Sequence, residues 1–154
     1  MNAPEVRIVK LEPMRVATFY GYSETPEEDA SSLCIAWLKE VDLYDHPESY
    51  RSFGFNNPNP TPGSPKYGYE LWIPVDADMD VGENIKTKEF PGGLYGVTTC
   101  ESLDTIGQDW KRLLAWRETS QFKPGSHEGL EELLTKFGES VDKYRFDLYI
   151  PIVE

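Results

Sequence analysis

Apolar and polar side chains alternate in the same way in two stretches of the chain, residues 67–75 (YGYELWIPV) and 144–152 (YRFDLYIPI). Position by position, both read Tyr, any residue, aromatic, acid, Leu, aromatic, Ile, Pro and a β-branched residue. Alternation with period two, rich in aromatic and β-branched residues, predicts a β-strand that ends near its proline. The offset of 77 residues in a chain of 154 indicates that one half repeats the other.

The alternation assigns the side chains of each predicted strand to two faces. One face is apolar and is predicted to be a core face; it carries Tyr67, Tyr69, Leu71, Ile73 and Val75 in the first copy and Tyr144, Phe146, Leu148, Ile150 and Ile152 in the second. The other face carries Glu70 and Trp72 in the first copy and Asp147 and Tyr149 in the second. Each copy therefore offers a carboxylate and an aromatic ring side by side, which makes these four residues candidate ligand-binding residues.

The remaining pattern predicts the elements around these strands. Residues 6–22 read as a strand region interrupted at Pro13, and 26–43 as a helix that begins with proline. We expect further strands at 50–55, 85–90 and 94–100, a proline-rich loop at 56–65 and an acidic linker at 76–83. A helix is predicted to start at Ser102 or Asp104, and another at 124–126, with Leu130, Leu133, Leu134 and Phe137 on one face and Gly138 at its end.

The predicted fold class is α+β, a strand-helix-strand-strand module that occurs twice, with pseudo-repeats at about 1–78 and 79–154 of a single domain. In each copy the helix should cover the apolar face of an antiparallel sheet, because both surfaces bury only against each other. The acid and aromatic residues then lie on the opposite face. Pseudo-twofold pairing of the copies would bring them towards a shared ligand groove.

Composition narrows the function. The hydrophobic content of 39% is that of a globular protein, and no stretch is long and apolar enough to span a membrane. Cys34 and Cys100 form no metal-binding spacing, so we expect reduced thiols, a cytoplasmic protein, no metal and no cofactor. The net charge of −12 argues against direct nucleic-acid binding and favours cationic ligands.

The order of several motifs resembles the GyrI-like small-molecule-binding family, which also supplies the effector-binding domain of bacterial AraC- and MerR-type drug-responsive regulators. The motifs are Phe55-Asn-Asn-Pro58 with Thr61-Pro62, residues 67–75, Gly92-Gly93-Leu-Tyr95 and residues 146–152. The resemblance implies a duplicated module with an aromatic, acid-containing groove for bulky, planar, often cationic compounds. Asp147 departs from the Glu that is common in the family at the last strand, and we expect no helix-turn-helix before the module. Phe55, Tyr20 and Tyr95 complete the candidate ligand-binding residues.

Three functions are consistent with this sequence. The first is a stand-alone binding protein for lipophilic, cationic aromatic small molecules, because aromatic faces attract cations and a carboxylate supplies the counter-charge. The second is a hydrolase of strained electrophilic xenobiotics, in which Glu70 or Asp147 would activate water. The third is a protein inhibitor of a DNA topoisomerase, which the acidic surface would serve by mimicking DNA.

Overall fold

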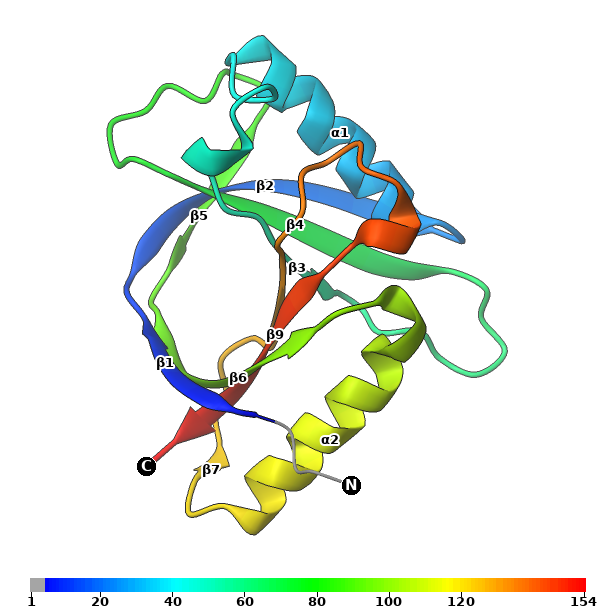
Figure 1. Ribbon diagram of the computed structural model, residues 1–154. Helices are drawn as coiled ribbons and strands as arrows, with labels where there is room; N and C mark the ends of the chain where they lie inside the picture. Colours follow the sequence, from blue (N-terminus) through cyan, green and yellow to red (C-terminus); the bar gives the residue numbers. More distant parts are fainter. Residues whose placement is uncertain (1–4) are drawn as a thin grey trace. The chain divides into compact units, whose positions relative to one another are not determined.

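Each half of the chain places one α-helix on one face of an antiparallel sheet (Figure 1). The computed structural model describes residues 5–154. They separate into two compact units: unit 2 runs from Met14 to Phe90, and unit 1 joins the described residues up to Pro13 to Pro91–Glu154. The α+β class with a repeated strand-helix-strand-strand order is confirmed. No described helix has the length and apolar character needed to cross a membrane.

Unit 2 contains four strands in the order β3-β4-β2-β5, all antiparallel to their neighbours. Along the chain its elements are β2 (Met14–Ser23), α1 (Pro26–Glu40), a 3₁₀ turn η1 (Pro47–Ser49), β3 (Phe53–Asn56), β4 (Tyr67–Val75) and β5 (Lys86–Phe90). The first signature stretch is β4, which has partners on both sides.

Helix α1 packs on the face of the unit 2 sheet that carries Leu71. On β2, Phe19 pairs with Leu71, and its ring lies 5.5 Å from the ring of Trp37 on α1. A Cβ on Gly21, further along the same face, would lie 2.6 Å from the carbonyl oxygen of Pro26, so glycine allows the helix to begin this close to the strand. The predicted register is therefore confirmed, and Glu70 and Trp72 point to the opposite face.

Unit 1 has the strand order β1-β6-β9-β8, with the short β7 also paired to β9. Its elements are β1 (Arg7–Leu11), β6 (Gly93–Cys100), η2 (Leu103–Thr105), α2 (Ile106–Thr119), β7 (Lys123–Pro124), β8 (Leu130–Leu133), η3 (Val141–Lys143) and β9 (Phe146–Val153). Leu113 of α2 packs with Leu148, Ile150 and Ile152 of β9 in one buried core. Asp147 and Tyr149 therefore lie on the face away from α2, as the alternation predicts.

The helix predicted to begin at 124–126 is wrong, because this segment forms β7 and β8 instead. The spacing of Leu130, Leu133 and Leu134 satisfies a helix, but the segment is anchored as a strand by its ladder with β9. Side chains on both faces of β8 are also held: Glu131 accepts a hydrogen bond from the indole of Trp110 at 3.0 Å, and Glu132 one from Tyr149 at 2.7 Å. Tertiary pairing outweighs the local pattern here.

Each unit takes its edge strand from the start of the other half of the chain. β1 immediately precedes β2, yet it pairs with β6 in unit 1, where Arg7 lies opposite Val97. β5 immediately precedes β6, yet it pairs with β2 in unit 2, where Lys88 lies opposite Val16. This exchange brings β5 onto the sheet that carries Glu70.

Candidate functional site

The carboxylate of Glu70 is the centre of a polar and aromatic cluster on the face of unit 2 away from α1. Glu70 is buried, with 4% of its surface exposed, although it is an acid in the middle of a strand. The Glu70 cluster consists of Glu70, Trp72, Phe55, Phe90, Asn57 and Lys88. Burial of a charged group is costly unless hydrogen bonds or an opposite charge compensate for the lost water, and the cluster supplies both.

Three donors reach the Glu70 carboxylate. The indole Nε1 of Trp72 donates to Oε2 at 2.6 Å, and the ammonium of Lys88 lies 2.7 Å from the same oxygen. The amide of Asn57 donates to Oε1 at 3.4 Å. The carboxylate is therefore held in one position, on the sheet face and directly beside an indole ring.

Three aromatic rings form a row across this face. The rings of Phe55 on β3 and Trp72 on β4 meet edge to face with centroids 5.0 Å apart, and the ring of Phe90 on β5 lies 5.3 Å from Trp72 on the other side. Phe55, Trp72 and Phe90 are all buried. Contacts with both phenylalanine rings hold the Trp72 indole in place, and its Nε1–H is therefore kept in position to donate to Glu70.

Tyr20 lies at the margin of the cluster. On β2 it is paired with Glu70, so both side chains project from the same face, and 45% of its surface is exposed. Its hydroxyl donates to the carbonyl oxygen of Asn57 at 2.8 Å. The structure thus brings together four of the predicted site residues in unit 2, namely Glu70, Trp72, Phe55 and Tyr20.

The corresponding face of unit 1 carries a second cluster, the Tyr149 cluster, composed of Tyr149, Glu132, Tyr95 and His127. The hydroxyl of Tyr149 donates to Glu132 at 2.7 Å, and both side chains are buried. The ring of Tyr95 meets Tyr149 edge to face at 5.4 Å and the His127 imidazole at 4.8 Å. Burial, and then the nearby Glu128 carboxylate, raise the pKa of Tyr95 well above its ordinary range, so it stays a neutral phenol.

Asp147 shares this face but not the hydrogen bond of Tyr149. Its carboxylate accepts from the hydroxyl of Thr99 at 2.7 Å and forms an ion pair with Arg7 at 3.0 Å. Arg7 also donates to Thr99 at 3.3 Å, which closes a small network at the edge of the sheet. In unit 1, therefore, the acid that contacts the strand's aromatic residue is Glu132.

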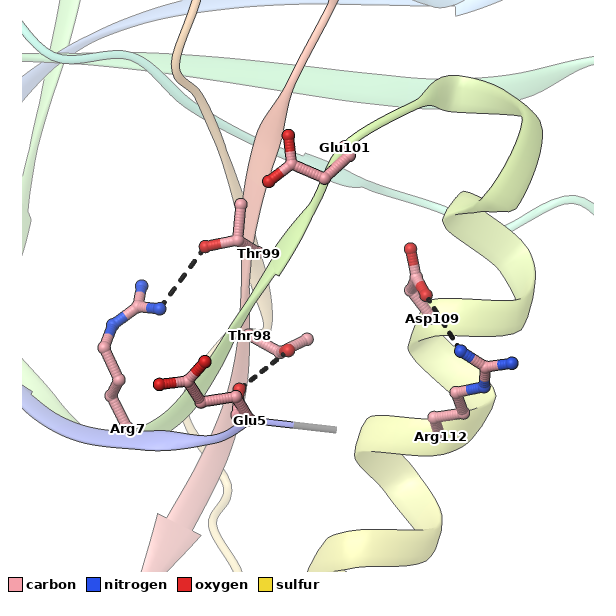
Figure 2. A pocket seen from close by; sticks show the side chains of 7 residues that line it. All are labelled: Glu5, Arg7, Thr98, Thr99, Glu101, Asp109 and Arg112. Atoms are coloured by element: carbon pink, nitrogen blue, oxygen red, sulfur yellow. Dashed lines mark hydrogen bonds and ion pairs between the residues drawn. The ribbon is translucent and has the colours of Figure 1, made fainter. Parts of the chain in front are cut away.

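A cavity of about 260 Å³ lies next to this network in unit 1 (Figure 2). In Figure 2, Arg7 reaches from β1 towards Thr99, while the ion-paired Asp109 and Arg112 come from α2. Among the described residues no aromatic side chain lines the cavity, and its three acids face two arginines, so it does not suit a lipophilic cation. Its lining residues are Glu5, Arg7, Thr98, Thr99, Glu101, Asp109 and Arg112.

Five members of the two clusters are not among the residues that the sequence predicts for the site. Lys88 and Phe90 lie on β5, and only the pairing of β5 with β2 brings them to Glu70. The sequence pattern places Glu132 in a helix and Asn57 in a loop, within the motif Phe55-Asn-Asn-Pro58, and nothing in it marks His127. No group of His, Cys, Asp or Glu that could hold a metal ion occurs among residues 5–154.

The repeated fold, with a helix on one face of each sheet and a carboxylate beside aromatic rings on the other, defines the class of effector-binding domains. The chain belongs to the family of integron-associated effector binding proteins, Cass2, whose model matches residues 7–152. The effector-binding character implied by the GyrI-like resemblance is confirmed, whereas the family that matches is Cass2. No protein of curated function matches this chain.

Solved structures with the same fold include regulators, hydrolases and ligand complexes. The EcmrR C-terminal domain is similar with a TM-score of 0.71 at 11% identity, over 99% of each chain. A hydrolase from Listeria innocua gives a TM-score of 0.69 at 9% identity, over 99% of this chain and 94% of that one. SAV2435, solved bound to tetraphenylphosphonium, gives 0.60 at 12% identity, over 97% of this chain and 94% of that one. At such identities the similarity shows the fold alone.

Proposed function

We propose that this protein binds bulky aromatic cations, of the kind found among drugs and other xenobiotics, and that the Glu70 cluster is its principal binding element. The observation that carries the proposal is a buried carboxylate fixed beside a row of three aromatic rings. A cationic ligand would meet the counter-charge of Glu70 and the faces or edges of Phe55, Trp72 and Phe90. The Tyr149 cluster is a second acid and aromatic pair, within unit 1.

The energetics favour this ligand class. A cation over an aromatic face gains about 0.5–2 kcal/mol, depending on how far it is desolvated. Two opposite unit charges about 4 Å apart attract by roughly 4 kcal/mol near a protein surface, and by less at the longer distance that bulky phenyl groups impose. Flat rings accept many shapes, since stacking is less directional than hydrogen bonding. The neighbour solved with tetraphenylphosphonium supports a large aromatic cation as the ligand.

A hydrolase is the second candidate, because the fold is shared with a hydrolase from Listeria innocua. A general base needs an oxygen that is free to take a proton from water. The Glu70 carboxylate instead receives three donors, one of them an ammonium. Asp147 is likewise engaged by Thr99 and Arg7. We therefore rank binding above hydrolysis.

As the wider setting we propose a cytoplasmic protein that responds to a small molecule and makes no direct contact with nucleic acid. The net charge of −12 would repel phosphate backbones and attract organic cations. Cys34 and Cys100 are both free, which suits a reducing compartment.

The proposal is tested by calorimetric titration with two ligands, tetraphenylphosphonium and the neutral triphenylphosphine oxide. Glu70→Gln keeps the shape of the side chain and removes its charge. We expect it to weaken tetraphenylphosphonium binding by roughly 1–3 kcal/mol, because this cation has no hydrogen-bond donor and meets the carboxylate through charge alone, and to leave the neutral compound nearly unaffected. Trp72→Ala should weaken both, because it removes the stacking surface.

Glu89→Gln is the matched control, since Glu89 lies on β5 as an exposed acid on the opposite face of the same sheet. It should change neither affinity by more than about 0.3 kcal/mol. Equal losses for both ligands in Glu70→Gln would make the acid structural, and no loss in either Glu70→Gln or Trp72→Ala would place the site elsewhere. Protein-dependent diol formation from stilbene oxide, abolished by Glu70→Gln, would establish the hydrolase instead.

A further inference from the structure

The Glu70 carboxylate already holds a cation, the ammonium of Lys88. The two charged groups are 2.7 Å apart, but they differ in accessibility: the Glu70 side chain is 5% exposed and the Lys88 side chain 52% exposed. Lys88 lies on the edge strand β5, in register with Val16, and its side chain extends along the sheet face to reach Glu70. The partner of this buried acid is therefore a side chain that already lies half in solvent.

Displacement of Lys88 would change the surroundings of its ammonium less than those of the Glu70 carboxylate. The Lys88 side chain is already half exposed, so its ammonium would pass into water with little change in hydration. Glu70 would keep its bonds from Trp72 and Asn57 and would need only a new cation at Oε2. Because Lys88 is tethered, it competes at a high effective concentration whatever the concentration of the external ligand.

We infer that Lys88 is an intramolecular competitor that occupies the cation position at Glu70 and selects which cations bind there. The inference rests on the proposed function and refines its ligand class. A small alkylammonium would replace one ammonium by another with no additional contact, and would not displace the tethered group. A large aromatic cation adds contacts with Phe55, Trp72 and Phe90, and these contacts drive the exchange. Lys88 thus makes aromatic surface a requirement for cation binding.

The test replaces the competing charge while retaining the side-chain stem. Lys88→Met is titrated with tetraphenylphosphonium, with tetramethylammonium and with triphenylphosphine oxide. We expect tetraphenylphosphonium affinity to rise roughly 10- to 100-fold, the value of one charge-assisted contact that no longer has to be broken. Tetramethylammonium binding should become measurable, and the neutral compound should be unchanged. Lys86→Met is the control, because Lys86 is exposed on the same strand and the same face, two residues away.

Lys88→Arg provides an independent arm if Lys88→Met does not fold. A guanidinium can grip a carboxylate through two donors, so it should compete better and lower tetraphenylphosphonium affinity below that of the unchanged protein. The salt dependence of tetraphenylphosphonium binding should also steepen in Lys88→Met, since the acid is then no longer neutralised internally.

The outcomes separate this inference from the proposed function. If Glu70→Gln weakens tetraphenylphosphonium but neither Lys88 variant shifts its affinity, the site stands and the competitor is refuted. If Lys88→Met weakens the cation and the neutral ligand equally, Lys88 is a structural residue and the inference is again refuted. If Glu70→Gln and Trp72→Ala have no effect, the proposed site itself fails. If Lys88→Met raises the affinity for the two cations and not for the neutral compound, and Lys86→Met does not, Lys88 is established as the competitor.

Discussion

The hydrogen bond between the Trp72 indole and the Glu70 carboxylate should make a measurable contribution to stability. Its length is 2.6 Å, both groups are buried, and the acceptor is charged, so the contact is worth about 1.5–3 kcal/mol. Trp72→Phe removes the Nε1–H donor and retains a ring next to Phe55 and Phe90. Loss of indole area adds about 1 kcal/mol, and we expect Trp72→Phe to lower the free energy of unfolding by roughly 2–4 kcal/mol.

A double-mutant cycle isolates the bond itself. Trp72→Phe, Glu70→Gln and the double variant are unfolded in urea, followed by far-ultraviolet circular dichroism because Trp72 is also a fluorophore. The coupling free energy should be about 1–2 kcal/mol, since the neutral amide still accepts a weaker bond. Trp72→Phe combined with Glu89→Gln should be additive within about 0.5 kcal/mol. A Trp72–Glu70 coupling no larger than that of this control pair would refute the argument.

Three further predictions concern other contacts. Tyr149→Phe should destabilise the protein by about 1–3 kcal/mol, because it removes the donor to buried Glu132; a loss in urea unfolding below about 0.5 kcal/mol would contradict this. Arg7→Met should lower the free energy of unfolding by no more than about 1 kcal/mol, because the Arg7 side chain that pairs with Asp147 is half exposed, and the loss should shrink in 1 M salt. Burial raises the pKa of Cys34 to about 12, so its thiol should resist labelling by dithionitrobenzoate at pH 8. The free energy of unfolding should fall between about pH 9 and 12, because only the unfolded thiol ionises in that range, and Cys34→Ala should reduce this pH dependence.

The register of the two signature strands could be predicted from alternation alone. Leu71 and Leu148 are buried on the helix-packed faces, and Glu70 and Asp147 point the other way, because a period of two leaves only one assignment once a face is apolar. Helix α1 begins at Pro26 as predicted, since proline at the first helical position marks a start.

The contact partners of the predicted site residues could not be predicted in the same way. Glu132 falls within the helix that the pattern wrongly predicts, because Leu-Glu-Glu-Leu fits a helix as well as a strand when its neighbour is unknown. Lys88 depends on β5 pairing with β2 and not with β6, which follows it in the chain. Which strand β5 pairs with depends on long-range packing, and the local sequence pattern does not indicate it. The sequence therefore predicted Glu70 and Asp147, but neither Lys88, which neutralises Glu70, nor Glu132, the acid that contacts Tyr149.

The exchanged edge strands also affect the order in which the strands can pair during synthesis on the ribosome. Unit 2 is one continuous segment, Met14–Phe90, and all its strands are available once β5 has emerged. β1 emerges first, yet its partner β6 is synthesised only after the whole of unit 2. During that interval β1 has no ladder in its own unit, and closing it onto β6 requires a long loop. The nascent chain therefore completes the unit that holds Glu70 first, and its oldest strand is among the last to be placed.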